Sequence, residues 1–432
     1  MQPLAAVGSL FLTLVLVVAR PRVGRFGRLN PVGGALPGVV LMFAAGVLKV
    51  HDLRRGLELL WRPFVTLASI MVMTAMAHRL GIFDRLTRSI EIRTRRPVPV
   101  AFTTVYVIGA ATAALFNNDA AILLLTPIVV PVIRRLYPQR GGYLVVPFSF
   151  AIFMSAGIAP LCTSNPMNLV VADHAGLGFN AYALRMLPVA VVGSIATYAM
   201  MRVAFRQKLE DVVPATGREA GSLPDMGGSS TAALLVILAM FASYPILSYF
   251  DGPVWIAALA GAALTCVLAL REDSITLRNV ADGVAWDILV FLYFIFVTAL
   301  GLENIGVTEL MAQAYRSAGS GPADGIGRIG ALSALGSAVL NNHPMAALNA
   351  LAIASLPGDN RWRTLAALVG GDLGPRLLPI GSLAGLLWLE MLRRLNVEVR
   401  ATDFVRIGFV VTIPALLASL ATLWIEARLF PP

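Results

Sequence analysis

The sequence predicts an all-α polytopic membrane protein, with about 10 transmembrane helices and two re-entrant hairpins in two inverted repeats. Of its 432 residues, 57% are hydrophobic and 13% are charged, whereas soluble domains carry about 25% charged residues. Apolar runs of spanning length recur from end to end, without the period-two alternation of a membrane barrel. Two similar polar clusters, Asn117-Asn118-Asp119 and Asn341-Asn342-His343, lie at corresponding places in the two halves.

The composition also excludes several classes of protein. The formal net charge of +10 is expected of a membrane protein whose basic residues are concentrated on one side, so no nucleic-acid partner is predicted. Two cysteines, Cys162 and Cys266, lie in apolar surroundings and give neither a disulfide framework nor a metal-binding spacing. We therefore expect no metal and no cofactor. Residues 4–19 lack a basic flank and a small-residue cleavage site, and they are expected to be a retained first helix.

The first half contains three unusual elements between ordinary spans. An amphipathic helix on the membrane surface is expected at 78–96, where apolar residues recur at helical spacing among arginines. A re-entrant hairpin is expected at 98–133, because two short arms flank a polar tip that only protein or water can surround. A broken helix is expected at 144–172, because Pro160 and Pro166 remove backbone donors in mid-span. The remaining spans of this first repeat, residues 1–203, are 3–19, 31–48, 63–77 and 184–203.

A polar segment without apolar periodicity, residues 204–230, is expected to be a cytoplasmic linker between the repeats. The second repeat, residues 231–432, follows the same plan. A polar stretch at 303–328, with an apolar face of Leu302, Ile305, Leu310 and Met311, precedes a second re-entrant hairpin at 329–356, which surrounds the Asn-Asn-His tip. A second broken helix is expected at 364–392, where glycines and prolines interrupt the apolar run. The ordinary spans of this repeat are 231–250, 253–270, 284–302 and 404–425.

The distribution of basic residues gives the orientation of this plan. Because each half ends on the opposite side from where it starts, the two halves are inverted. With both termini outside, the predicted inner loops carry more than twice as many Lys and Arg residues as the outer ones. That asymmetry follows the positive-inside rule. The loop at 49–62, with four basic residues on the predicted outer side, departs from it.

Inverted repeats bring hairpin tips and broken helices together near the bilayer midplane, where half-helix termini and free backbone groups form a transporter's central site. An amide-rich lining suits a small hydroxylated solute or a compact anion, and it does not suit a lipid. The predicted solute-binding residues are Asn117, Asn118, Ser164, Asn165, Asn168, Asn341, Asn342, His343 and Ser382. The predicted proton-coupling residues are Asp119, Asp372 and His343.

Each ionisable candidate has an alternative role. Asp119 and His343 occupy equivalent places in the two repeats and could exchange protons, but Asp119 could instead cap the returning arm of its hairpin. Arg376 could pair with Asp372, or it could attract an anionic solute. Cys162 could offer a thiolate to a thiophilic ion, although a lone buried cysteine usually packs as a small hydrophobe.

Five stretches of the chain resemble the ArsB-type arsenite efflux carriers of the ion transporter superfamily. They are residues 116–127, 164–173, 178–182, 341–345 and 371–388. The last stretch, GDLGPRLLPIGSLAGLLW, is the most specific, and the resemblance is collinear over nearly the whole chain. Two departures are Arg376, where the resemblance predicts lysine, and His343 within the second tip.

The resemblance implies a transporter of a bacterial inner membrane, not an enzyme. It implies export of trivalent arsenic or antimony, as arsenite or antimonite, in exchange for protons and by an elevator-type movement. It further implies, in some systems, a soluble arsenite-stimulated ATPase as partner beside the surrounding membrane lipid. The chief alternative is a sodium/proton antiporter or a small-anion carrier on the same scaffold. An intramembrane aspartyl protease would need a second Gly-Asp motif opposite Gly371-Asp372, and none lies on a partner span.

Overall fold

A computed structural model describes the chain except for residues 1, 23–28, 210–226, 273, 317–324 and 431–432. The described part contains helices and no strand, which confirms the all-α prediction. The first half comprises α1 (Gln2–Ala19), α2 (Pro31–Ala44), α3 (Val50–Arg79), α4 (Ile82–Thr94), α5 (Val98–Leu115), α6 (Asn118–Leu136), α7 (Gly141–Ser155), η2 (Cys162–Ser164), α8 (Pro166–His174) and α9 (Phe179–Ala204).

The second half comprises α10 (Gly228–Tyr249), α11 (Val254–Ala269), α12 (Leu277–Asp282), α13 (Trp286–Asn304), α14 (Val307–Arg316), α15 (Ile326–Leu340), α16 (Asn342–Ala354), α17 (Arg361–Leu373), η3 (Gly374–Arg376), η4 (Pro379–Gly381), α18 (Leu383–Arg394) and α19 (Ala401–Leu429). Most of the predicted linker, residues 204–230, lies outside the described residues.

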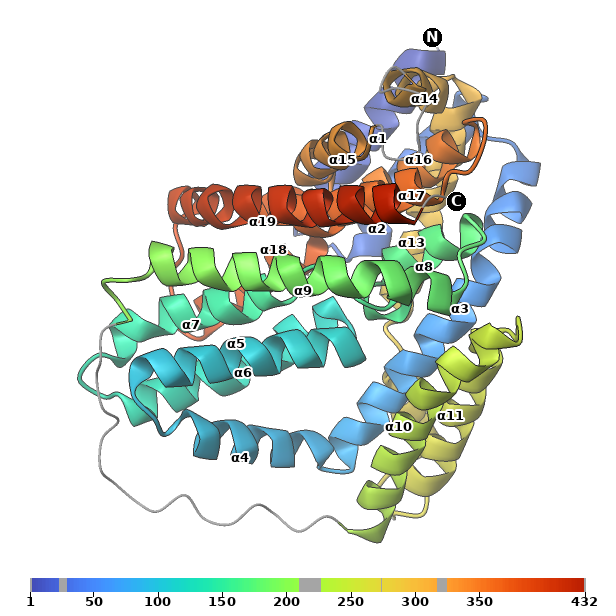
Figure 1. The fold of residues 1–432 in the computed structure, drawn as a ribbon. Helices are drawn as coiled ribbons and strands as arrows, with labels where there is room; N and C mark the ends of the chain where they lie inside the picture. The colour runs from blue at the N-terminus through green and yellow to red at the C-terminus, as the bar shows by residue number, and fades with distance from the viewer. Residues whose placement is uncertain (1, 23–28, 210–226, 273, 317–324, 431–432) are drawn as a thin grey trace.

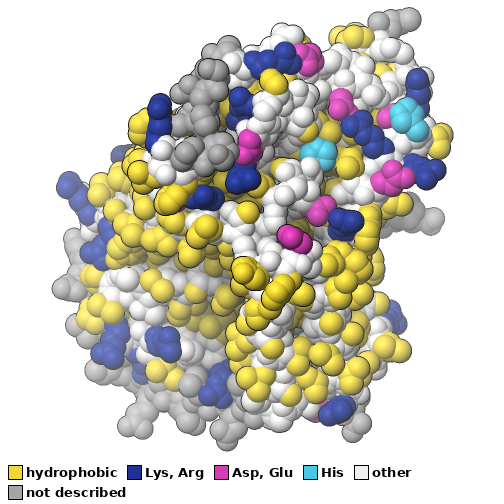
Figure 2. Space-filling model, turned by 45° about the vertical axis from the view of Figure 1, so that its right-hand side comes forward, with side chains coloured by type: hydrophobic (Ala, Val, Ile, Leu, Met, Phe, Trp, Pro, Cys, Tyr) yellow, Lys and Arg dark blue, Asp and Glu magenta, His cyan; other side chains and the backbone are white. Residues whose placement is uncertain are grey.

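Helices of membrane-spanning character dominate the described part of the chain. Seven helices are long and apolar enough to cross a membrane, and four shorter apolar helices, α2, α7, α11 and α15, accompany them. Large hydrophobic side chains such as Leu235, Leu259 and Val267 on α10 and α11 are about half exposed. Figure 2 shows hydrophobic side chains spread over a broad area of one face. Such a surface is expected to face lipid rather than water.

One boundary in the first half was predicted wrongly. The third span was expected at 63–77 after a loop at 49–62, but α3 is continuous from Val50. The Asp52 carboxylate accepts a hydrogen bond of 2.8 Å from the Lys49 backbone amide and so starts the helix. Pro63 lies inside the helix without ending it. The predicted basic loop is therefore a helical extension of the span.

The surface helices lie close to their predicted positions in the sequence, but not all of the residues that they bury are the predicted ones. The expected amphipathic helix is α4, which buries Phe83 and Ile90 against the first half. Within the predicted polar stretch 303–328, α14 is helical, but Leu310, expected on its apolar face, is 66% exposed. The buried residues of α14 are Thr308, Ala312 and Tyr315.

Helices of each half pack against helices of the other half. The opening helices of the first half, α1 and α2, pack on α13 of the second, and α10 and α11 pack on α3 of the first. The helix that follows each break is exchanged in the same way, because α8 packs on α16 and α18 packs on α6. The last helices of the two halves, α9 and α19, lie side by side along much of their length (Figure 1). The broken segment of each half therefore lies against the hairpin of the other half.

Candidate functional site: two broken segments and their hairpin tips

Each half contains a helix that stops in mid-span and restarts through a side-chain cap. In the first half α7 ends at Ser155, and α8 restarts where Asn165 accepts a 3.1 Å hydrogen bond from the amide of Met167. In the second half α17 ends, and α18 restarts where the Ser382 hydroxyl accepts a 2.9 Å bond from the amide of Gly385. Capping satisfies helix-start donors that would otherwise be stranded away from water.

Each hairpin tip is tied to the break of its own half. The Asn118 side-chain amide donates to the carbonyl of Gly157 at 3.0 Å, and the Asn341 amide donates to the carbonyl of Ile380 at 3.2 Å. Both bonds link residues 39 apart in the sequence, although Asn341 corresponds to Asn117 rather than to Asn118 in the two tips. The two halves therefore tie tip to break in a similar but not identical way. Ser164 adds a 2.6 Å bond to the carbonyl of Ala114 on the first hairpin.

Asp372 lies at the end of α17 and joins the two breaks. Its carboxylate is 7% exposed and accepts hydrogen bonds from the Ala159 backbone amide at 3.0 Å and from the Asn165 and Asn168 side chains at 2.7 and 2.8 Å. The Tyr182 hydroxyl accepts from Asn168 at 2.8 Å and donates to the carbonyl of Ala159 at 3.0 Å. All these donors to the carboxylate come from the first half, so a second-half charge is stabilised by the opposite repeat.

A small cavity borders this carboxylate. Its lining includes Asn165, Asn168, Asn342 and Asp372, and its volume is about 10 Å³. That volume is close to the minimum for one water molecule. The side-chain oxygen of Asn342 is buried and has no hydrogen-bond partner within the described protein. The breaks and the second tip therefore converge on a closed polar site.

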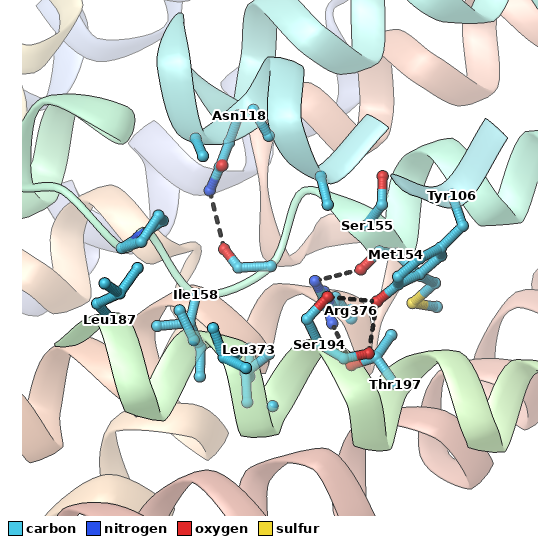
Figure 3. A pocket seen from close by; sticks show the side chains of 18 residues that line it. Tyr106, Asn118, Met154, Ser155, Ile158, Leu187, Ser194, Thr197, Leu373 and Arg376 are labelled. Atoms are coloured by element: carbon cyan, nitrogen blue, oxygen red, sulfur yellow. Dashed lines mark hydrogen bonds between the residues drawn. The ribbon is translucent and has the colours of Figure 1, made fainter. Parts of the chain in front are cut away.

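A larger cavity of about 210 Å³ lies on the other side of the first break (Figure 3). It extends from Asn118 to Arg376, and α5 and α9 supply much of its wall. The Arg376 side chain, 2% exposed, donates to the carbonyl of Met154 at 2.5 Å and to the Thr197 hydroxyl at 3.4 Å. Arg376 and Asp372 form no ion pair at contact distance in the described structure, so the predicted pairing is not a direct one.

The structure distributes the predicted residues over more than one place. His343 is 3% exposed, and its Nδ1 lies 3.1 Å from the Asn341 side-chain oxygen, with the Phe291 ring 5.7 Å away. Asp119 lies in the first turn of α6, beside the other tip. Neither forms an ion pair with the other in the described chain. Each tip thus contacts a break. In this conformation Asp119 and His343 are not in direct contact, so a proton cannot pass between them directly.

Among the described residues, no group of three His, Cys, Asp or Glu side chains lies close enough together to bind a metal ion. Cys162 is 3% exposed and borders a third cavity, of about 350 Å³, together with Arg62 and Asp173. That cavity is separate from the one beside Asp372. The Cys162 side chain is packed in the hydrophobic core as a small apolar residue.

Sequence reasoning missed the tyrosines of this region. Tyr182 is fully buried, and the sequence predicted no role for it. The signal available was its place just after the first broken stretch, within residues 178–182. Tyr315 was also missed; its hydroxyl donates at 2.5 Å to Asn349, which borders the Asp372 cavity.

A Tyr182→Phe substitution is expected to lower stability by about 1 to 2 kcal/mol, because it leaves the carbonyl of Ala159 and one donor of Asn168 without their partner. Thermal unfolding of the purified protein measures this loss. Tyr244→Phe is the matched control, because the Tyr244 hydroxyl is buried without any hydrogen-bond partner in the described structure. Equal effects of the two substitutions would contradict the role given to the Tyr182 hydroxyl.

Comparison with known proteins adds a family and a fold. A family model described as arsenical pump membrane protein matches residues 5–427. Arsenical pump membrane proteins of Escherichia coli and Yersinia enterocolitica are 30% identical, covering 96% of this chain and 97% of theirs. An uncharacterized transporter of Mycobacterium tuberculosis is 26% identical, covering 92% of this chain and 94% of its own.

Two solved transporter structures share the fold. The YdaH transporter of Alcanivorax borkumensis has a TM-score of 0.60 at 14% identity, over 100% of this chain and 99% of that one. MtrF of Neisseria gonorrhoeae, described as an antimetabolite efflux pump, has a TM-score of 0.60 at 13% identity, over 98% and 94%. At this identity the likeness concerns architecture alone.

Proposed function

Because the chain belongs to the arsenical pump membrane protein family, we propose that it exports trivalent arsenic and antimony, as arsenite and antimonite, across a bacterial inner membrane. Its relatives are membrane pumps and not enzymes. The structural observation that supports this proposal is the buried carboxylate of Asp372, held between two broken segments by amides of the opposite repeat.

The cargo chemistry fits the amide-rich lining. Arsenous acid is a small trihydroxide that is mostly neutral at pH 7, and it needs both donors and acceptors. Asn165, Asn168 and Asn342 offer both, and the orphaned oxygen of Asn342 is available to a hydroxyl. A buried site built to hydrogen-bond hydroxyl groups discriminates strongly against solutes that lack them. Since the cavity holds only about 10 Å³ here, binding requires the breaks to separate.

Proton exchange is the second part of the proposal. When Asp372 is ionised, it holds three first-half donors and closes the site; when it takes a proton, its charge-assisted hydrogen bonds weaken. Loss of those bonds would let the two breaks part. Asp119, which is partly buried beside the first tip, and His343, which is buried beside the second, are proposed to carry protons toward or away from this carboxylate.

Transport is proposed to follow an elevator movement, in which the hairpins and breaks move against the exchanged helix groups α1, α2, α13 and α10, α11, α3. Both termini are proposed to lie outside the cell, as the basic residues indicate. The linker between the repeats then faces the cytoplasm. A soluble arsenite-stimulated ATPase could add to the driving force on that side.

Uptake of arsenite and antimonite into everted membrane vesicles tests the proposal. Vesicles containing the protein are expected to accumulate both metalloids when a pH gradient is imposed, with or without sodium. Accumulation that requires sodium, or a pH gradient that drives no metalloid uptake, would instead favour a sodium/proton antiporter or a small-anion carrier. Vesicles without the protein supply the background.

An Asp119→Asn substitution is expected to lower gradient-driven arsenite uptake on the order of tenfold, which corresponds to about 1.4 kcal/mol. The side chain keeps its shape but can no longer carry a proton. The measurement is the initial uptake rate in everted vesicles, corrected for the amount of protein. A variant that still accumulates arsenite as well as the parent would remove Asp119 from the proton route.

A further inference from the structure

Arg376 is a buried cation without a carboxylate at contact distance in the described structure. Its guanidinium makes two hydrogen bonds, to the carbonyl of Met154 and to the hydroxyl of Thr197, and its Nε has no partner. A guanidinium removed from water is costly unless an opposite charge or further acceptors compensate it. The proposed transport of a neutral solute at Asp372 makes no use of this cation.

The surroundings of Arg376 provide hydroxyl groups and space. The cavity of about 210 Å³ is lined by Tyr106, Ser194 and Thr197 as well as Arg376. The Tyr106 hydroxyl donates to the Ser194 carbonyl at 2.8 Å and lies 3.1 Å from the Ser194 hydroxyl. In Figure 3 these three hydroxyl groups and the guanidinium gather at one end of the cavity.

Gly157, in the first break, leaves room for the guanidinium of Arg376 because it has no side chain. A Cβ added at Gly157 would lie 3.3 Å from Cζ of Arg376 and still closer to one of its terminal nitrogens. The same glycine offers its carbonyl to Asn118 on the opposite side. Its backbone therefore separates the hairpin tip from the guanidinium, and any larger residue would push Arg376 away from the cavity.

We propose that Arg376, with the hydroxyl groups of Tyr106, Ser194 and Thr197, forms a binding site for a small monovalent oxyanion. A planar guanidinium matches two oxygens of such an ion, and the Thr197 hydroxyl donates to the remaining oxygen, while the Tyr106 hydroxyl stays bonded to Ser194. Arg376 is the single Lys or Arg residue among those lining this cavity, which favours one negative charge over two. The site is distinct from the closed cavity at Asp372 and holds whether or not arsenite is the cargo.

Nitrate binding to the purified full-length protein tests the site. Nitrate is planar and monovalent, and boric acid serves as a neutral trihydroxide probe of similar size. Titration calorimetry is expected to show nitrate binding that weakens about tenfold or more in Arg376→Gln. Arg376→Lys, which keeps the charge but loses the planar fork, should lie in between. Absence of nitrate binding to the parent, or equal binding to Arg376→Gln, would overturn the proposal.

A second pair of variants keeps the test valid if Arg376→Gln does not fold. Thr197→Val removes one hydroxyl while the guanidinium stays, and it should weaken nitrate binding several-fold without changing the response to boric acid. Thr13→Val is the matched control, because Thr13 is a buried threonine on α1, away from the cavity. Equal nitrate affinities in Thr197→Val and Thr13→Val would exclude the Thr197 hydroxyl from the site.

Transport kinetics distinguish the two sources of such an anion. If the ligand is the ionised form of the metalloid acid, nitrate should raise the KM for arsenite uptake. If it is a free inorganic ion, nitrate should leave KM unchanged while it still binds, whether or not it changes the maximal rate. Either result supports an anion site. Failure of arsenite uptake in every condition would instead reject the proposed function. The conclusion from the nitrate titration would still hold, because it depends on binding alone.

Discussion

An Asp372→Asn variant is expected to lose arsenite accumulation by about a hundredfold, equivalent to roughly 2.7 kcal/mol. The substitution removes the charge that three donors share, and its new amide group would face the amides of Asn165 and Asn168. Two amide donors pointing at one another leave at least one of them unpaired in a buried place. Initial rates in everted vesicles, with and without a pH gradient, measure the effect.

The control for this variant is Asp282→Asn, which neutralises an exposed carboxylate at the end of α12. Its closest basic group lies 3.9 Å away and both partners are largely exposed, so its removal is expected to change little. An Asp372→Asn protein that keeps the parent's gradient-dependent uptake would show that neither the proton exchange nor the closure depends on this charge.

A Gly370→Ala substitution is expected to reduce the amount of folded protein strongly, by roughly 3 kcal/mol of stability. At Gly370 the backbones of α17 and α15 approach so closely that a Cβ would lie 2.8 Å from the amide nitrogen of Ala334 and 2.8 Å from Cβ of Ser333. Backbone atoms cannot move aside as a flexible side chain could, so the helices must separate. Thermal unfolding and the monodispersity of the purified protein report this change.

Gly327→Ala supplies the comparison, because Gly327 lies on α15 with nothing within 4 Å of its added Cβ. Alanine favours a helix interior by up to about 1 kcal/mol over glycine, so this variant should be neutral or more stable. Equal stability of Gly370→Ala and the parent would mean that the two helices are not in the contact described here.

The sequence predicted most of the fold because its signals are local. Apolar run length, the prolines of the broken stretches and the paired Asn-Asn tips each depend on neighbouring residues, and the corresponding helices occur where they were expected. The beginning of α3 was missed because a backbone-to-side-chain bond at Asp52 starts the helix among charged residues, which hydropathy alone assigns to a loop.

The arrangement of the site was harder to predict because its contacts are long-range. Asn165 and Asn168 were expected to bind solute, yet both donate to Asp372, a residue of the other repeat. Ser382 was also expected at the solute, and in the structure its hydroxyl caps α18. No local pattern specifies which donor satisfies which acceptor across such a distance in sequence. The contacts of the buried Tyr182 with Asn168 and Ala159 are of the same kind.

The exchanged packing of the two repeats has a consequence for biosynthesis. While the ribosome is still producing the second half, the newly inserted α8 has no α16 to lie against, and the side chains of Asn165 and Asn168 have no carboxylate to bind. A nascent first half would expose unpaired amides within the bilayer until translation passes residue 372. Quality-control proteases should therefore degrade the first half when it is synthesised alone, whereas two fragments divided between the repeats and produced together should protect each other.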